Sequence, residues 1–258
     1  MKRGLWDREM VALLLLLALM PMLLAWLGFE GIDALARLIF TLVISGFWHL
    51  IFMLARAQPP SFAGALTSVA VAILAPQELS VVQLILGISF GSVMAELVFG
   101  GWGRNVLNPA TVTLAFLGFG FPSAPWHEFA LPVSWAAIAA LAIGAFFGVM
   151  STRLILGAVA VLAVALLAGL PIGAALPTAG IVLALLVTDP VASASTRLGG
   201  WLNGALYAAL VVLFATGWQD AAPAQIAVSA ALLASLAAPL LDEIAIALWI
   251  AHRRRRHG

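Results

Sequence analysis

The sequence predicts an all-α polytopic membrane protein that crosses the bilayer about ten times. Of its 258 residues, 64% are hydrophobic and 9% are charged, whereas soluble domains are about half apolar and about a quarter charged. Glycines, prolines and charged residues divide the chain into apolar stretches near the length of about 20 residues that crosses a hydrocarbon core. Cations gather in alternate connections between these stretches, as they do where cytoplasmic loops are basic.

Ten apolar stretches are predicted as spans, and the third, fifth and eighth are short. They cover residues 10–29, 32–54, 61–75, 80–100, 109–121, 133–150, 154–170, 173–187, 200–218 and 224–250. The first stretch is long enough to span and no A-x-A cleavage site follows it, so it is interpreted as a retained helix.

The third and eighth spans are both short and both end at a proline, Pro76 and Pro190. If five spans are followed by five more, these two occupy equivalent positions in opposite orientations. Short or broken helices that meet near the midplane are typical of inverted repeats. The sequence therefore predicts one membrane domain, residues 1–258, with a first repeat over 1–122 and a second over 133–258.

The charges predict that both termini lie in the cytoplasm. With a cytoplasmic amino terminus, alternation places nearly all cations on the inner side and leaves Arg37 as the exception. The inner cations are Lys2, Arg3, Arg8, Arg56, Arg104, Arg153, Arg197 and the four arginines of 253–256. The outer loops then carry Glu30, Glu78, Glu128 and Asp220.

The stretch FGGWGRNVLNPATV, residues 99–112, is the first candidate binding site. Asn108 before Pro109 predicts a helix start, because the amide side chain caps free N–H groups while proline occupies the first helical position. Gly103, its neighbouring glycines and Asn105 permit a tight turn with exposed donors. Such a turn presents its N–H groups to a ligand carbonyl or anion. A capped re-entrant turn without a ligand explains the same residues equally well.

A second start of this kind is LLVTDPVASASTRLGG, residues 185–200. Here Asp189 is the expected cap and Pro190 opens the following segment. On spacing alone this is a well-capped loop at the inner face.

Glu96 and Asp242 are the two carboxylates predicted inside spans, and Asp242 is expected deep in the tenth. A charge at the centre of a span costs about 2.5 to 3.5 kcal/mol on insertion scales, so each is a candidate to bind a cation or relay a proton. For Glu96 the alternatives are snorkelling or pairing with Arg104. His49 is expected to be an ordinary hydrogen-bonded histidine, because no second intramembrane histidine is present to complete a haem site.

The chain contains no cysteine, so it supplies no disulfide, no thiolate-ligated iron–sulfur cluster and no thioether-linked haem. No spacing of ligands indicates a metal site, and no triad indicates a nucleophile. The near-neutral net charge makes nucleic acid an unexpected partner.

Two blocks of sequence resemble a known family. The first is SFAGALTSVAVAILAP with AELVFGGWGRNVLNPATVTLAFLGFGFP, and the second is LPTAGIVLALLVTDPVASASTRLGGWLNGALYAALVV with LAAPLLDE. In this order, over about half the chain, they resemble the RnfD/NqrB family, the membrane flavoproteins of the Rnf complex and of the sodium-translocating NADH:quinone reductase. The GRN-x-x-NPA pattern is specific, and a TDPV segment follows it downstream as it does in the family.

The resemblance implies an inverted-repeat subunit of the bacterial inner membrane, distantly like urea channels in architecture. Such a subunit passes electrons between flavins beside ion-translocating partners, which are other membrane and peripheral redox subunits, and quinone is a further candidate ligand. It implies that a flavin without covalent attachment lies near Asn105 and Asn108, with Gly103 and Asp189 in the same site. A carboxylate matching Asp242 is linked to ion uptake, with Glu96 as a second candidate.

The sequence departs from the family at the covalent flavin site. Relatives attach flavin mononucleotide (FMN) to a threonine in an S-(G or A)-A-T motif after the fifth span, but residues 122–132, PSAPWHEFALP, contain no threonine. The run from Ser193 to Thr196 lacks the alanine before threonine and is predicted on the opposite face. We therefore expect no covalent FMN, and at most a non-covalent riboflavin or FMN.

Two other functions remain open at this point. The scaffold could have kept a pore and lost its flavin, which would make the protein a transporter or channel for a small solute or cation. It could also be a structural assembly subunit without a ligand. Flavin content would distinguish electron transfer from both, and flux into vesicles would identify a transporter.

Overall fold

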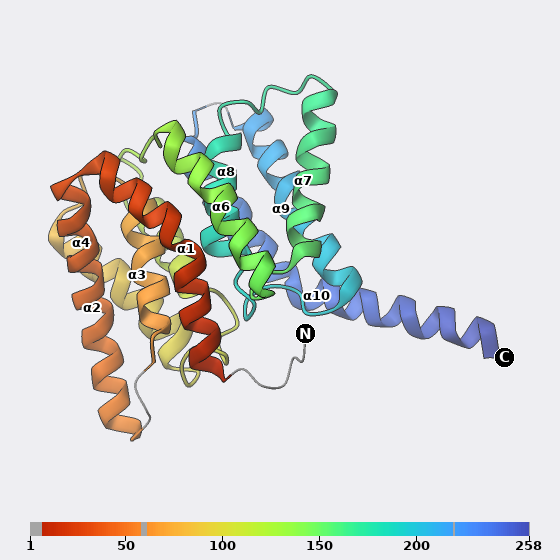
Figure 1. Cartoon of the computed structure of the whole chain (residues 1–258), viewed down its shortest axis with the longest axis horizontal. Coiled ribbons are helices and arrows are strands. Elements are labelled where there is room, and N and C mark those ends of the chain that lie inside the picture. The colour runs from red at the N-terminus through yellow and green to blue at the C-terminus, as the bar shows by residue number, and fades with distance from the viewer. Residues whose placement is uncertain (1–6, 58–60, 219, 258) are drawn as a thin grey trace.

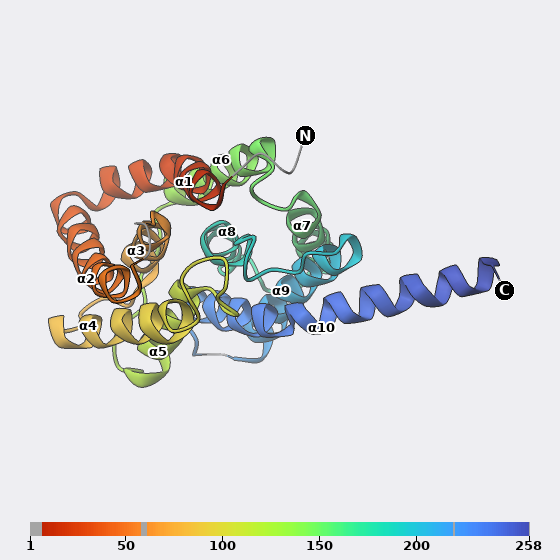
Figure 2. The ribbon, with the colours of Figure 1, turned by 90° about the horizontal axis from the view of Figure 1, so that it is seen from below.

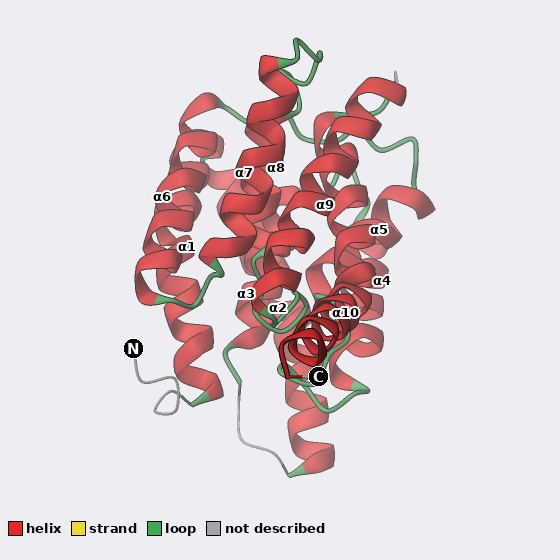
Figure 3. Ribbon diagram, turned by 90° about the vertical axis from the view of Figure 1, so that its right-hand side faces the viewer, coloured by secondary structure: helices red, strands yellow, loops and turns green. Residues whose placement is uncertain are grey.

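The computed structural model describes residues 7–57, 61–218 and 220–257, and all regular structure within them is helical (Figure 3). Four helical stretches are long and apolar enough to cross a membrane: Arg8–Glu30, Ile32–Arg56, Arg197–Gly217 and Pro223–Arg254. Six shorter apolar helices accompany them. These observations confirm the prediction of an all-α polytopic membrane protein.

The helices follow the predicted spans closely. The first half contains α1 (Arg8–Glu30), α2 (Ile32–Arg56), α3 (Ala63–Leu74), α4 (Val81–Phe90), its π-helical continuation η1 (Gly91–Leu97), and α5 (Pro109–Gly120). The second half contains α6 (Leu131–Phe147), α7 (Thr152–Leu167), α8 (Leu176–Val182), its π-helical continuation η2 (Leu183–Val187), α9 (Arg197–Gly217) and α10 (Pro223–His257). The third and eighth helices are short, as predicted. The two π-helical segments were not predicted.

Side chains cap five of the helix starts. A bilayer offers no water to the free N–H groups of a helix end, so the protein must satisfy them itself. The capping residues are Asp7, Ser80, Asn108, Ser151 and Thr196, each of which accepts a hydrogen bond from a backbone N–H of its own helix. The sequence therefore determines where these helices begin.

The two halves pack with corresponding partners. In the first half α1 contacts α3, α3 contacts α5, and α4 contacts α5; in the second half α6 contacts α8, α8 contacts α10, and α9 contacts α10. The halves meet through α1 against α6 and α5 against α10, and α1 and α6 lie side by side in two views (Figures 1 and 2). The contact of α2 with α3 has no comparable counterpart between α7 and α8, and the inverted repeat stays a prediction.

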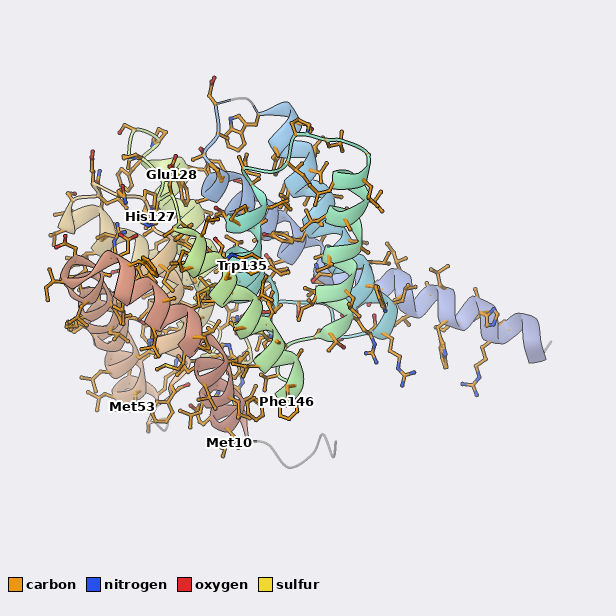
Figure 4. The ribbon with its side chains drawn as sticks, turned by 45° about the horizontal axis from the view of Figure 1, so that its top comes forward. Met10, Met53, His127, Glu128, Trp135 and Phe146 are labelled. Atoms are coloured by element: carbon orange, nitrogen blue, oxygen red, sulfur yellow. The ribbon has the colours of Figure 1, made fainter. Side chains whose placement is uncertain are left out.

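One end of the bundle carries Met10 and Met53, and the other carries His127 and Glu128 (Figure 4). The first end corresponds to the predicted inner face, with Arg8 and Arg56 close by in the chain. Lys2 and Arg3 lie outside the described residues. Which end faces the cytoplasm stays a prediction.

Helix α10 is longer than its predicted span and leaves the bundle. Its carboxyl-terminal part, which follows Pro239 inside the helix, projects sideways from the other helices (Figures 1 and 2). Asp242 lies 19 residues after the first residue of α10, which is about 29 Å along a helix that rises 1.5 Å per residue. Because this part of α10 projects sideways from the bundle (Figures 1 and 2), length along the helix does not give a depth in the bilayer, and the expectation that Asp242 lies deep stays a prediction.

Candidate functional site

The turn between η1 and α5 is held by its own asparagines. The Asn108 side-chain oxygen accepts hydrogen bonds from the backbone N–H groups of Ala110 at 2.9 Å and Thr111 at 3.2 Å, with Pro109 in the first helical position. This geometry confirms the predicted cap.

Asn105 and Gly103 shape the turn rather than a ligand surface. The Asn105 oxygen accepts from the N–H of Gly103 at 3.0 Å, and its amide donates to the carbonyl of Leu107 at 2.9 Å. Gly103 has a φ of 93°, and Gly100 and Gly101 also have positive φ, a backbone region that favours glycine. The Asn105 side chain is buried, so its bonds fix the turn from inside.

Asn108 also joins the two halves of the molecule. Its amide nitrogen donates to Asp189 Oδ2 at 2.8 Å, although the two residues lie 81 positions apart. Asp189 Oδ1 accepts from the N–H of Val191 at 3.0 Å. Burial raises the pKa of Asp189, in the loop after η2, to about 6, against the opposing effects of its hydrogen bonds with Val191 and Asn108. The expectation that Asp189 starts a helix was wrong, because it lies in a turn and the next helix, α9, begins at Arg197 with Thr196 as its cap. The two stretches identified in the sequence meet in one buried polar contact.

The space around this contact is small. A cavity of about 30 Å³ lies between Trp102, Asn108, Thr188 and Asp189. That is close to the volume of one water molecule and far below the several hundred Å³ of small-molecule sites. A flavin ring therefore does not fit between Asn108 and Asp189.

A larger cleft of about 270 Å³ opens on the other side of the turn. Residues of α1, α2, η1, the turn and Ser61 line it: Arg8, Gly46, His49, Leu50, Phe52, Met53, Arg56, Ser61, Glu96, Leu97, Gly100, Gly101 and Trp102. Trp102 is 5% exposed, and it lines both this cleft and the small cavity beside Asn108. The cleft lies at the end of the bundle that carries Met53, which is itself part of the lining.

Two arginines anchor the walls of the cleft. Arg56 donates to the carbonyls of Leu97 at 2.6 Å and Val98 at 3.1 Å, at the end of η1. Arg8 donates to the carbonyl of Trp102 at 3.2 Å. Both guanidinium groups therefore donate hydrogen bonds to backbone carbonyls at the end of η1 and in the turn, and they bring positive charge to the cleft.

Glu96 lies at the base of this cleft in η1. It is 1% exposed, and its Oε1 lies 3.1 Å from Nε2 of His49. Its Oε2 has no hydrogen-bond partner among the described residues. The alternatives of snorkelling and of pairing with Arg104 were wrong, because the carboxylate points inward to α2. His49 is hydrogen-bonded, as expected.

Asp242 has a different environment. Its two oxygens accept four hydrogen bonds, from the N–H and hydroxyl groups of Ser195 at 2.8 and 3.0 Å and from those of Thr196 at 2.9 and 2.6 Å. The Thr196 hydroxyl also accepts from the N–H of Gly199 at 3.0 Å. In this structure Asp242 therefore fastens the loop before α9 to α10.

Arg37, the exception to the charge pattern, lies near the opposite end. Its guanidinium donates to the carbonyl of Pro76 at 2.5 Å, where the chain leaves α3. Nearby, His127 bridges Gln77 and Glu30 from the loop between α5 and α6. These bonds give the polar residues at this end of the bundle a packing role.

The sequence did not reveal the cleft. Arg8 and Arg56 were interpreted only as topology signals, and His49 as an ordinary buried histidine. Their positions in the chain carry no sign that they converge with the turn, because α1, α2 and η1 meet only in the folded protein. No cluster of three metal-ligating side chains occurs within the described ranges.

The fold and the site define a polytopic helical membrane protein with a cleft beside a buried polar turn. The model of the NQR2, RnfD, RnfE family matches residues 6–142. The NqrB protein of the Na(+)-translocating NADH-quinone reductase of Pseudomonas paraeruginosa is 31% identical over 276 aligned residues, which cover 84% of this chain and 68% of the relative. The NqrB protein of Klebsiella pneumoniae is 39% identical over 101 residues, 38% of this chain and 24% of the relative.

The chain belongs to the NQR2, RnfD, RnfE family. Together with its apolar helices, this membership makes it a multi-pass protein of the inner membrane. The resemblance drawn from the sequence motifs is confirmed.

Proposed function

We propose that this chain is the membrane subunit of an Rnf-like or Nqr-like ion-translocating electron-transport complex, and that it transfers electrons through a flavin bound without a covalent link. The observation that carries the proposal is the cleft of about 270 Å³, which opens against Gly100, Gly101 and Trp102, the residues just before the GRN-x-x-NPA motif. The chain belongs to a family with this motif. Other membrane and peripheral redox subunits are the expected partners. Quinone is the alternative occupant of the cleft.

The residues of the cleft suit a flavin ring. The volume of about 270 Å³ is close to the lower end of small-molecule sites, about 300 Å³, which supports a ring-sized occupant. Leu50, Phe52 and Met53 would supply apolar walls, and Arg8 and Arg56 would supply hydrogen-bond donors. A bound flavin supplies the electron chemistry, while the protein binds and orients it.

The asparagines act one step away from the ring in this proposal. Asn105 and Asn108 hold the turn that places Gly100, Gly101 and Trp102 along the cleft. Without either set of hydrogen bonds, the turn would no longer hold these cleft-lining residues in position. We therefore expect flavin loss on substitution even without direct contact.

Two further parts of the proposal concern the architecture. The corresponding contacts of the halves support an inverted repeat of residues 1–122 and 133–258 within one membrane domain. The cations at the Met53 end of the bundle support cytoplasmic termini. Of the two candidate ion-pathway carboxylates, Glu96 is the stronger, because Asp242 already accepts four hydrogen bonds.

The test is the visible spectrum and acid-extractable flavin of the gently solubilised protein, purified with its accompanying subunits. We expect near-stoichiometric flavin that acid releases, and its loss when Asn105 and Asn108 are both replaced by alanine. Asn203→Ala is the matched control, since Asn203 is an equally buried asparagine that bonds the carbonyl of Ala234 in the second half.

Unchanged flavin in the double variant would rule out this site. A colourless wild-type preparation would instead favour the transporter, and solute flux into liposomes would then be measured.

A further inference from the structure

We propose that Glu96 and His49 share one exchangeable proton and form the proton-transfer site of the cleft. Its transfer role rests on the proposed redox function, whereas the shared proton is a property of this chain alone. Glu96 comes from η1 and His49 from α2, 47 positions apart in the chain, so only the fold creates the pair.

The first step concerns the ring nitrogen that faces the backbone. His49 Nδ1 lies 2.9 Å from the carbonyl oxygen of Ser45. A carbonyl can only accept a hydrogen bond, so Nδ1 must carry a hydrogen. In a neutral imidazole the other nitrogen, Nε2, is then a bare acceptor.

The second step concerns the contact between Nε2 and Glu96 Oε1 at 3.1 Å. Two bare acceptors cannot form a hydrogen bond, so one proton must lie between them. The pair is therefore either a neutral carboxylic acid beside a neutral imidazole or a carboxylate beside an imidazolium. Both forms have no net charge, which suits burial in a membrane better than a lone carboxylate does.

The imidazole ring is held in this orientation. A Cβ atom added at Gly64 of α3 would lie 2.8 Å from His49 Cε1 and 2.9 Å from Nδ1. Glycine at position 64 leaves room for the ring against α3, and the hydrogen bond between Nδ1 and the Ser45 carbonyl orients the ring.

The third step concerns access to the cleft. Glu96 and His49 both line it, and Glu96 Oε2 is buried without a partner among the described residues. Nearly all buried polar atoms in proteins are hydrogen-bonded, so a free carboxyl oxygen beside a cleft indicates a group that binds there. A carbonyl or a ring nitrogen of a ligand in the cleft would give Glu96 Oε2 a hydrogen-bond partner.

Four other charged groups lie near the pair. Arg8 of α1 and Arg56 of α2 line the same cleft, and Arg8 pairs with Glu9 at 3.2 Å. Asp189, in the loop after η2, interacts unfavourably with Glu96. When an electron from a partner subunit adds negative charge to the cleft, the pair transfers its proton to the reduced group. A carboxylate and a neutral imidazole remain, and a proton from water at the cleft mouth restores the pair.

The shared proton is tested by ¹⁵N nuclear magnetic resonance of histidine-labelled protein in lipid bilayers, with the His49 signals assigned by their loss in His49→Gln. We expect Nδ1 to carry a hydrogen and Nε2 to be protonated or hydrogen-bonded. A bare Nδ1 would overturn the proposal. This readout does not need flavin, so it decides the pair even if the wild-type protein is colourless.

The transfer role is tested with Glu96→Gln in the flavin-containing complex, with a pH-indicator dye. An amide keeps the shape of the acid but cannot release a proton, so we expect about one proton fewer to be taken up per flavin reduced, counted on the flavin that the variant retains. Asp242→Asn is the control and should keep full uptake. Full uptake in Glu96→Gln would contradict the transfer role, and His49→Gln replaces this variant if it does not fold.

Discussion

Glu96 and Asp242 are both carboxylates within apolar spans, yet the two halves of the molecule use them differently. In the first half, Glu96 is fully buried, meets His49 through one oxygen and leaves the other without a partner among the described residues. In the second half, Asp242 is partly exposed and accepts four hydrogen bonds from Ser195 and Thr196. A carboxylate in a span is therefore a functional candidate only when the fold leaves its oxygens free.

The two halves also differ in how closely their helices pack against one another. In the second half α7 and α9 touch through glycines, because a Cβ at Gly204 would collide with the carbonyl of Leu154 and one at Gly157 with that of Trp201. In the first half α2 packs on α3 and stands beside η1 across the cleft. The first half carries the cleft beside Glu96, and the second half carries a pocket of about 470 Å³ between the start of α9 and the end of α10, with Arg197 and Trp249 in its lining.

The largest expected effect comes from disturbing the close contact between α7 and α9. Gly204→Ala should lower the unfolding free energy by about 3 kcal/mol or more, because a rigid backbone carbonyl cannot move aside as a side chain can. Thermal unfolding of the detergent-solubilised protein measures this. Gly28→Ala in α1, with nothing within 4 Å of the added Cβ, is the control. Equal stability of the two variants would contradict the close approach of α7 and α9.

The comparison of the carboxylates is sharpened by removing each in turn. Asp242→Ala should cost about 2 to 3 kcal/mol, since four charge-assisted hydrogen bonds are lost at a partly exposed position. Glu96→Gln should cost less than about 1 kcal/mol, because the amide can still bond His49. The same unfolding assay applies, and a larger loss for Glu96→Gln would reverse our assignment of the two roles.

The stability of the folded protein should depend on pH through Asp189, which joins the two halves by its hydrogen bond with Asn108. Its pKa is about 6 in the folded protein, above the ordinary value of about 3.9 for an unfolded chain. The folded state therefore binds the proton more tightly, and stability should fall by about 2 to 3 kcal/mol as pH rises from about 4 to 6. Asp189→Asn should flatten this part of the profile of unfolding temperature against pH. An unchanged slope would show that another group controls it.

Effects smaller than those of Gly204→Ala and Asp242→Ala are expected at the turn itself. Asn108→Ala removes a helix cap and leaves Asp189 without one donor, so it should cost about 1 to 2 kcal/mol. Asn105→Ala should cost about 1 kcal/mol, since its two bonds stay within the turn. Chemical denaturation measures both, and the order would be wrong if Asn105→Ala were the more destabilising.

Much of the fold was predictable because its signals are local. Apolar length located the ten helices to within a few residues, except at the end of α10, and Asn108 before Pro109 marked the start of α5. The caps Ser80 and Thr196 were not predicted. The π-helical turns were missed, since the apolar pattern of Gly91–Leu97 does not distinguish them from α-helix. The site was predicted only in part: the residues of the turn were identified, but not the cleft beside it.

The sequence by itself determined the class of protein, the spans, the capped turns and the family resemblance, because hydrophobicity and capping act between near neighbours in the chain. Only the tertiary structure decided what the polar residues do. Asn108 meets Asp189 across 81 positions and Glu96 meets His49 across 47, while Asp242 is occupied by Ser195 and Thr196. The role of a buried polar group depends on which partners reach it, and helix packing, rather than sequence spacing, brings those partners together.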